Sequence, residues 1–189
     1  MPQVLWETSP PMTDTEFLQF CAGREDLDIE VNSRGEFEIS PNSGFISGQK
    51  NGEITYQLIH WARVDRRGIV TDSSTLFRLP NGAKRSPDAA WTERSSVAPY
   101  LASKQMQVFP ICPEFVIELR SPTDDLARLQ EKMHEWIING AQLAWLVDPI
   151  GKTTTVYRPG AAPEVVADLV VRGEGPVQGF ELHLAEIYE

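Results

Sequence analysis

Cysteine and histidine are scarce in this sequence. The 189 residues include two cysteines, Cys21 and Cys112, and three histidines. The cysteines are far apart and form no CxxC pattern, which argues against a disulfide scaffold or a zinc knuckle. The histidines are isolated from one another and from the cysteines. A transition-metal site with His and Cys ligands is therefore poorly supported.

Long apolar runs and repeats are also missing. No uninterrupted apolar segment approaches the length needed to cross a bilayer, so no membrane association is expected. The first residues, MPQVLWETSPPMTDTEF, have no basic start and no apolar core segment, and are not expected to act as a signal peptide. No repeat of 20–50 residues is visible, which excludes solenoids and propellers. The expected compartment is a reducing cytoplasm.

Positive charge is in deficit. Seventeen Lys and Arg face 27 Asp and Glu, which gives a net charge of −10. A general nucleic-acid binder is unlikely to be this acidic, because counterion release requires a basic surface. An enzyme with one local basic groove is still compatible with this balance.

Hydrophobic content is ordinary for a globular protein, at 41% hydrophobic and 23% charged residues. A chain of this length can bury one self-sufficient core without a disulfide or metal. We therefore expect a single domain over residues 1–189, with a Pro-rich arm at about 1–12.

The pattern of apolar residues predicts mixed α/β structure with more strands than helices. Thr13 to Glu16 reads as a capping box that opens a short helix. The continuous β-branched run 115–119 is typical of a central, buried strand. The strongest predicted helix covers 124–139, with Gly140 at its C-terminal stop.

Other segments give weaker signals. Residues 51–63 have apolar positions at helical spacing. Residues 69–70 and 75–79 resemble two strands around a turn, with Pro80 to Gly82 closing a hairpin. Residues 98–107 have some helical character. A second hairpin is expected from 143–147 and 153–157.

Three charged residues break the local apolar pattern. Asp88 follows a proline at the start of a short apolar stretch, and Glu118 interrupts the most hydrophobic predicted strand. Lys132 lies on the apolar seam of the long helix, between Leu129 and Trp136. A charge in a buried strand costs several kcal/mol unless it is paired or binds a metal. Lys132 is the natural counter-charge for Glu118.

Two carboxylates and a lysine are the groups used in metal-assisted phosphodiester hydrolysis. The carboxylates would hold a hard cation such as Mg²⁺ through oxygen. The cation would polarise the phosphate and lower the pKa of a bound water, while the lysine would position or deprotonate that water. Residue types alone leave a second interpretation open, in which Glu118 and Lys132 form a purely structural ion pair.

Longer motifs surround these residues in a fixed order: SSTLFRLPNGAKRSPDAAW, FPICPEFVIELRSPTDDLARLQEKMHEWIINGAQLAWLVDP, YRPG and GFELHLAEIY. With them, the chain resembles the Uma family of restriction-endonuclease-like proteins, within the PD-(D/E)xK nuclease superfamily. The resemblance runs from about Phe17 to Tyr188. It implies a restriction-endonuclease-like fold, in which helices flank a central mixed sheet with the active site at one end.

The resemblance also implies roles for single residues. Asp88 matches the acid of the PD element, Glu118 matches the acid before Ser-Pro, and Lys132 matches the helical lysine of the pattern L-Q-x-K-M. The superfamily lysine two positions after the acid is replaced by Arg120, which is always protonated and cannot act as a general base. The implied metal ligands are Asp88, Glu118 and the Leu119 carbonyl, with Mg²⁺ or Mn²⁺ as the ion.

Further candidates are less specific. Glu53, in the helix matching the family's first helix, is either a third metal ligand and catalytic carboxylate or an exposed helical residue. Arg78, Lys84 and Arg85 bracket the Pro87-Asp88 element and form the best local basic patch, although a solvated surface commonly explains such charges. Lys84, Arg85 and, separately, Arg120 are candidates for auxiliary phosphate binding.

With the family in view, the expected function is a Mg²⁺-dependent endonuclease acting on DNA. A homodimer is expected, because cutting both strands of a duplex needs two sites related by a two-fold axis. No phosphate-binding Gly loop is present, and no organic cofactor is expected. The alternative, favoured by the net charge of −10, is a non-catalytic interaction or regulatory protein on the same scaffold. A carboxylate-pair glycosidase would leave Lys132 unexplained.

Overall fold

The computed structural model describes residues 4–7, 12–42, 44–102 and 107–189. They form two six-stranded sheets, a two-stranded sheet and flanking helices, which confirms the mixed α/β class. The helices are α1 (Asp14–Cys21), α2 (Phe45–Asp65), α3 (Arg94–Val97), α4 (Leu126–Ile138) and the 3-10 turn η1 (Gly175–Val177). The strands are β1 (Val4–Glu7), β2 (Leu27–Val31), β3 (Glu36–Pro41), β4 (Gly68–Asp72), β5 (Leu76–Arg78), β6 (Lys84–Arg85), β7 (Ala89–Glu93), β8 (Val108–Phe109), β9 (Phe115–Leu119), β10 (Leu143–Asp148), β11 (Thr153–Tyr157), β12 (Glu164–Val166), β13 (Val170–Arg172) and β14 (Glu181–His183).

The central sheet has the strand order β12-β11-β10-β9-β7-β4. Strands β9 and β10 are parallel and are joined by α4, while the other pairs are antiparallel. The strand predicted over 115–119 coincides with β9, which is buried along its whole length. The hairpin predicted from 143–157 is confirmed as β10 and β11.

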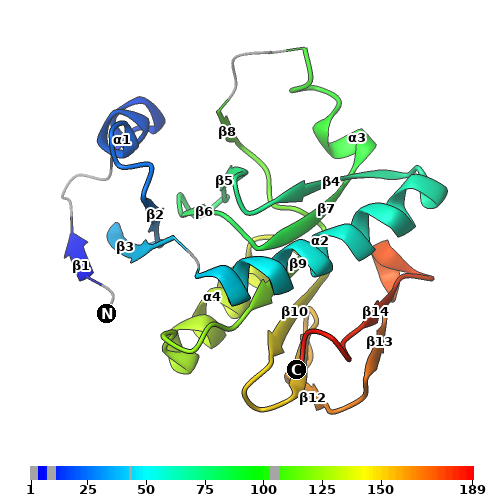
Figure 1. The fold of residues 1–189 in the computed structure, drawn as a ribbon. Helices are drawn as coiled ribbons and strands as arrows, with labels where there is room; N and C mark the ends of the chain where they lie inside the picture. The colour runs from blue at the N-terminus through cyan, green and yellow to red at the C-terminus, as the bar shows by residue number, and fades with distance from the viewer. Residues whose placement is uncertain (1–3, 8–11, 43, 103–106) are drawn as a thin grey trace.

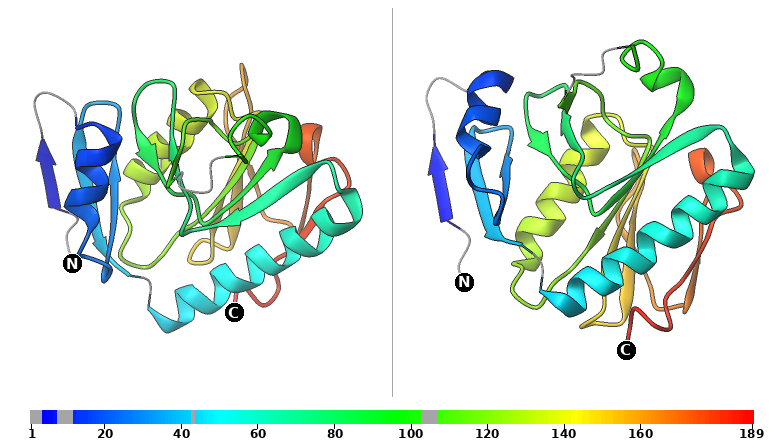
Figure 2. Two further views of the ribbon diagram at one scale, coloured as in Figure 1. Left: turned by 90° about the horizontal axis from the view of Figure 1, so that it is seen from above. Right: turned by 45° about the horizontal axis from the view of Figure 1, so that its top comes forward.

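Two long helices cover opposite faces of this sheet (Figure 1). Ile54 and Leu58 of α2 pack with Ile117 of β9 on one face, together with the C-terminal hairpin β13–β14. Met133 and Trp136 of α4 pack on the other face. The views in Figure 2 show α2 running across the edge of the molecule below β7 and β9. Residues that alternate along β9 therefore face different helices.

The N-terminal sheet has the order β1-β3-β2-β6-β5-β8. Helix α1 covers it, with Phe17 packed near Phe37. The predicted capping box is confirmed, because the Thr13 hydroxyl accepts from the Glu16 amide and the Glu16 carboxylate accepts from the Thr13 amide. No helix among the described residues combines the length and apolar character that a membrane crossing requires.

The hairpin predicted within 69–79 is wrong in its pairing. Strand β4 pairs antiparallel with β7 in the central sheet, while β5 pairs with β6 around the Asn81–Gly82 turn in the other sheet. A Cβ atom at Gly68 would lie 2.1 Å from the Trp91 ring, so the absence of a side chain there lets the indole pack against β4. Burial of Trp91 thus favours β7 as the partner of β4.

Two predicted segments also differ at their ends. The helix in the 98–107 region falls earlier, over Arg94–Val97, and residues 103–106 lie outside the described residues. The arm predicted over residues 1–12 includes β1, which pairs antiparallel with β3. Residues 1–3 and 8–11 of that arm lie outside the described residues.

Candidate active site

Asp88 lies where the chain enters β7, beside the end of β9. Its Oδ2 atom accepts a hydrogen bond of 2.7 Å from the Leu119 amide, and its Oδ1 atom accepts one of 2.8 Å from Asn51 Nδ2 on α2. The side chain is half-buried. The Oδ1 atom of Asn51 is buried and has no partner among the described residues. This arrangement holds the Asp88 carboxylate at a fixed place with an unused oxygen next to it.

Glu118 points from β9 toward α4, on the face opposite α2. Its Oε1 atom accepts a hydrogen bond of 2.9 Å from Trp136 Nε1 and lies 2.9 Å from Lys132 Nζ. Its neighbours Ile117 and Leu119 point to the other face, because side chains alternate along a strand. Glu118 is therefore a buried acidic residue, 4% exposed, in an otherwise apolar strand.

Lys132 reaches from α4 into a ring of oxygen atoms. Its Nζ lies 2.9 Å from a carboxylate oxygen of Glu118, 3.0 Å from Oε1 of Glu30 and 3.2 Å from the carbonyl of Ser86. The side chain is 11% exposed. The ammonium group is thus held between the Ser86 carbonyl, which precedes Pro87, and the carboxylates of Glu118 and Glu30.

Glu30 was not predicted from the sequence. It lies on β2 of the N-terminal sheet, where its carboxylate also accepts from the Ser86 amide at 2.5 Å. A signal was present, because Glu30 stands between Ile29 and Val31 as Glu118 stands between Ile117 and Leu119. Only the three-dimensional packing of the two sheets brings Glu30 to Lys132.

The electrostatics of the site favour proton or cation uptake by two carboxylates. Burial raises the pKa of Asp88 to about 6, with a further contribution from the charge on Glu30. Burial also raises the pKa of Glu118 to about 8, against the attraction of Lys132 and with repulsion from Asp88. Both carboxylates are therefore poorly compensated when ionised at neutral pH.

The other two charges behave in the opposite way. Burial opposes the charge on Lys132, but Glu118 and Glu30 outweigh it and raise the pKa of the lysine above its ordinary value. Burial likewise opposes the charge on Glu30, but Lys132 and Arg85 outweigh it and lower the pKa of that carboxyl. Lys132 and Glu30 are thus a persistent ion pair.

The donor set fits a hard divalent cation. Asp88 and Glu118 are oxygen donors whose negative charges repel each other, and a cation between them would remove that repulsion. Within the described residues, no three acidic, histidine or cysteine side chains are arranged as a ready metal cluster. Mg²⁺ in proteins is usually bound by one or two carboxylates, and water or phosphate oxygens complete its coordination shell. The two carboxylates and the Leu119 carbonyl are compatible with this arrangement.

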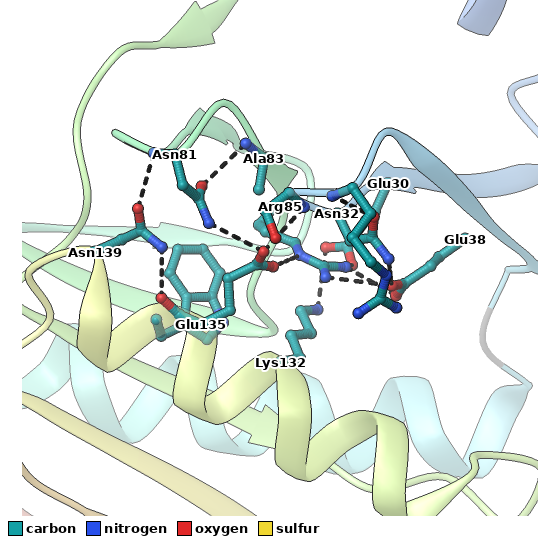
Figure 3. Close-up of polar contacts among 12 residues, drawn as sticks. Glu30, Asn32, Glu38, Asn81, Ala83, Arg85, Lys132, Glu135 and Asn139 are labelled. Carbon is teal, nitrogen blue, oxygen red and sulfur yellow. Dashed lines mark hydrogen bonds and ion pairs between the residues drawn. The ribbon is translucent and has the colours of Figure 1, made fainter. Parts of the chain in front are cut away.

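Arg85 lies behind this site, in a buried network that joins the two sheets through α4. Its guanidinium is 2.6 Å from Glu135, 2.8 Å from Glu38 and 3.1 Å from Glu30. Figure 3 shows Lys132 and Glu135 extending from α4 toward Glu30 and Glu38 of the N-terminal sheet. The phosphate-binding role expected for Arg85 finds no support in this placement, because its side chain is enclosed by carboxylates.

Lys84, like Arg85, is buried and already has partners within the protein. Its Nζ lies 3.6 Å from Asp14 and donates to the Met12 carbonyl at 3.1 Å, and the side chain is buried. The structure therefore gives it partners at α1 rather than an open position for a substrate phosphate.

Arg120 and Glu53 are the remaining expected residues. Arg120 follows β9 and pairs with Asp148 at 2.8 Å, partly open to solvent. Glu53 accepts a 2.9 Å hydrogen bond from Gln57, whose side chain also bonds the main chain of His183. The Glu53 side chain therefore lies toward β14, whereas Asn51 on the same helix reaches Asp88.

Comparison with known proteins agrees with this architecture. The model of the Uma2 family, described as "Putative restriction endonuclease", matches residues 14–185. The chain belongs to the Uma2 family. It is similar to the crystal structure of a putative nuclease of the DUF820 family from Anabaena variabilis, with a TM-score of 0.79 and 19% identity over 94% of this chain and 98% of the other. No curated protein matches it.

The structural similarity confirms the restriction-endonuclease-like fold that the sequence predicted. Membership of the Uma2 family and this fold together support a nuclease.

Proposed function

We propose that this protein is a metal-dependent endonuclease that hydrolyses phosphodiester bonds of DNA with Asp88, Glu118 and Lys132. One observation carries the proposal: the Lys132 ammonium contacts Glu118 while the Leu119 amide, one residue along β9, binds Asp88. Two carboxylates and one cation thereby meet at the end of a single strand. Each comes from a segment that breaks the local apolar pattern.

Asp88, Glu118 and the Leu119 carbonyl are the groups that would hold Mg²⁺ or Mn²⁺. Such an ion, when bound, polarises the scissile phosphate and lowers the pKa of a bound water. The Asn51 amide keeps the Asp88 carboxylate oriented, and the Trp136 indole does the same for Glu118. These contacts prevent the carboxylates from rotating away from a shared ligand.

Lys132 serves to orient water and to offset phosphate charge rather than to take a proton. Its raised pKa keeps the ammonium protonated at neutral pH, so it donates hydrogen bonds. Of the two roles expected from the sequence, positioning of the attacking water is therefore favoured over deprotonation.

A cleavage assay on circular DNA tests the proposal, since only an endonuclease opens a circle. Asp88→Asn, Glu118→Gln and Lys132→Met should each lower the rate about 10²-fold or more, with removal of Mg²⁺ and Mn²⁺ doing the same. Lys132→Met keeps the side-chain volume. The matched control is Glu164→Gln, a largely exposed carboxylate on β12. Undiminished cleavage by the three variants, with intact thermal unfolding, would assign the reaction to other residues.

A homodimer and a cytoplasmic location are part of the proposal on sequence grounds. Light scattering on the purified protein tests the first. A dimer provides two sites for the two strands of a duplex, whereas a monomer restricts each binding event to one strand. Cell fractionation tests the second.

A non-catalytic interaction protein is the second candidate. The net charge of −10 and the four oxygen atoms that already contact Lys132 favour it. It requires that neither Mg²⁺ nor Mn²⁺ stabilise the protein, because only a ligand that binds the folded state raises its stability.

A further inference from the structure

A groove runs along one side of α2, away from the core. Its first part has a volume of about 610 Å³ and is bounded by Asn51, Tyr56 and Arg63 of α2 and by two carboxylates, Asp28 of β2 and Asp72 of β4. Asn51 is the residue that binds Asp88. This part of the groove therefore opens beside the proposed active site.

A second hollow continues the first. It has a volume of about 650 Å³ and shares Ile59 and Arg63 with the first part. Its base is apolar, and Arg63, Arg66 and Arg94 surround it. The two parts form one path along α2 from Asn51, which binds Asp88, to a group of arginines.

These arginines are unusual for such an acidic chain. Arg63, Arg66 and Arg94 are exposed, and none forms an ion pair with a described carboxylate, whereas the next arginine, Arg67, pairs with Asp65. Arg94 also donates from Nε to the Arg66 carbonyl at 3.0 Å, which brings the α2 end and the α3 start together. Three guanidinium groups thus converge around one hollow on a protein of charge −10.

Between the two ends lies an aromatic surface. Tyr56 is 60% exposed and lines the groove, with its ring centroid 5.9 Å from that of His60, one helical turn further along. Cationic grooves interleaved with open aromatic rings are how proteins bind single nucleic-acid strands, because phosphates pair with the cations and bases stack on the rings.

We propose that this α2 groove binds a single DNA strand, with its phosphates on Arg63, Arg66 and Arg94 and an unpaired base on Tyr56. The inference rests on the proposed function, since the groove passes Asn51 and so leads a strand to the Asp88 carboxylate. It also explains how an acidic protein can bind DNA: the favourable charge is concentrated in the second hollow, where Arg63, Arg66 and Arg94 lie, whereas Asp28 and Asp72 line the first.

The test measures binding without cleavage. Fluorescence anisotropy of a fluorescein-labelled oligonucleotide, single-stranded or duplex, is recorded in EDTA over a range of salt. The double variant Arg63→Gln/Arg94→Gln should weaken single-strand binding about tenfold or more and reduce the slope of log K against log salt by about 1.4, which is about 0.7 for each lost phosphate contact on a single strand. The control Lys152→Gln/Arg172→Gln, which removes the same charge from exposed positions outside the groove, should leave both values near those of the wild type.

Variants of Tyr56 distinguish the contribution of base stacking to binding from that of the arginine charges. Tyr56→Ala should weaken single-strand binding about tenfold, while Tyr56→Phe should retain it, because the aromatic face is preserved. Equal losses in the arginine and control variants would overturn the inference. So would tighter binding of duplex together with an unchanged affinity of Tyr56→Ala.

The same variants distinguish this inference from the proposed function. Groove-dependent binding without any metal-dependent cleavage would retain the strand path and remove the nuclease. Cleavage at the wild-type rate by Arg63→Gln/Arg94→Gln at substrate concentrations below saturation would retain the nuclease and remove the strand path.

Discussion

The Nζ atom of Lys132 lies 3.0 Å from Oε1 of Glu30, a contact between a helix of the central layer and a strand of the N-terminal sheet. This pair gives the ammonium a second carboxylate partner besides Glu118. It also adds a negative charge beside two carboxylates whose pKa values are already raised. Glu30 is therefore a positioning residue with an electrostatic effect on the proposed ligands.

Replacement of Glu30 should change both rate and pH dependence. Glu30→Gln should lower cleavage by about 10–100-fold, because Lys132 loses one of its anchors. It should also shift metal-induced stabilisation to lower pH, since the Glu30 charge raises the pKa of both Asp88 and Glu118. Glu38→Gln is the control, because Glu38 shares Arg85 but has no contact with Lys132 among its ion pairs. A rate loss without the pH shift would indicate a structural role only.

Metal stabilisation should increase with pH. Protons must leave Asp88 and Glu118 before a cation binds, and the pKa values of these groups are raised to about 6 and about 8. Thermal unfolding with Mg²⁺ or Mn²⁺ should therefore show little effect below about pH 6 and the full effect above about pH 8. A cation at about ten times its Kd adds roughly 1.4 kcal/mol, or about 3–6 °C in Tm. A shift independent of pH would place the ion elsewhere.

The substitution Asp88→Asn should stabilise the metal-free protein at alkaline pH. Because the folded-state pKa of Asp88 is raised to about 6 from an ordinary value of 3.8, the wild type loses stability as pH rises through this window. The amide removes that loss, about 1–3 kcal/mol. A half-turn of the Asn51 amide, whose Nδ2 bonds Asp88 in the wild type, lets its unpaired Oδ1 atom accept from the new amide nitrogen. Urea unfolding at about pH 4.5 and about pH 8 measures the difference. A variant less stable than wild type at both pH values contradicts this account.

Replacement of Arg85 should lower the free energy of unfolding far more than replacement of an arginine in a surface ion pair. Arg85→Met leaves three poorly exposed carboxylates without their shared cation, and should cost about 3–5 kcal/mol. Arg34→Gln breaks a pair whose arginine side chain is 63% exposed, and should cost about 1 kcal/mol or less. Chemical denaturation of both variants gives the comparison. Similar losses would show that the buried network is no more stabilising than a surface pair.

Local patterns allowed part of the fold and site to be predicted. Strand β9 and helix α4 could be predicted because the apolar pattern of each lies within a short stretch of sequence. Glu118 and Lys132 could be singled out because each is a charged residue that interrupts one of these apolar patterns. The partner of β4 could not be found, since it depends on the fit of Trp91 against Gly68 after the chain has folded.

Glu30 and the buried state of Arg85 were missed for a related reason. Strand β2 joins β6 through the single pair Val31–Lys84, and no local pattern specifies this pairing. The enclosure of Arg85 by three carboxylates from β2, β3 and α4 requires both sheets to be in place. The sequence around Arg85 alone predicts an open basic patch, because the three acids that enclose Arg85 come from distant parts of the chain.

The network behind the site also bears on the order of folding. The bond between the Ser33 amide and Glu135 joins residues 102 positions apart, and the contacts of Arg85 with Glu30 and Glu38 join residues 55 and 47 positions apart. Closure of such long loops is slow compared with formation of a helix or a hairpin. During refolding, helical signal should therefore return before the lysine reaches its second carboxylate, so the complete site should form only after the helices and hairpins.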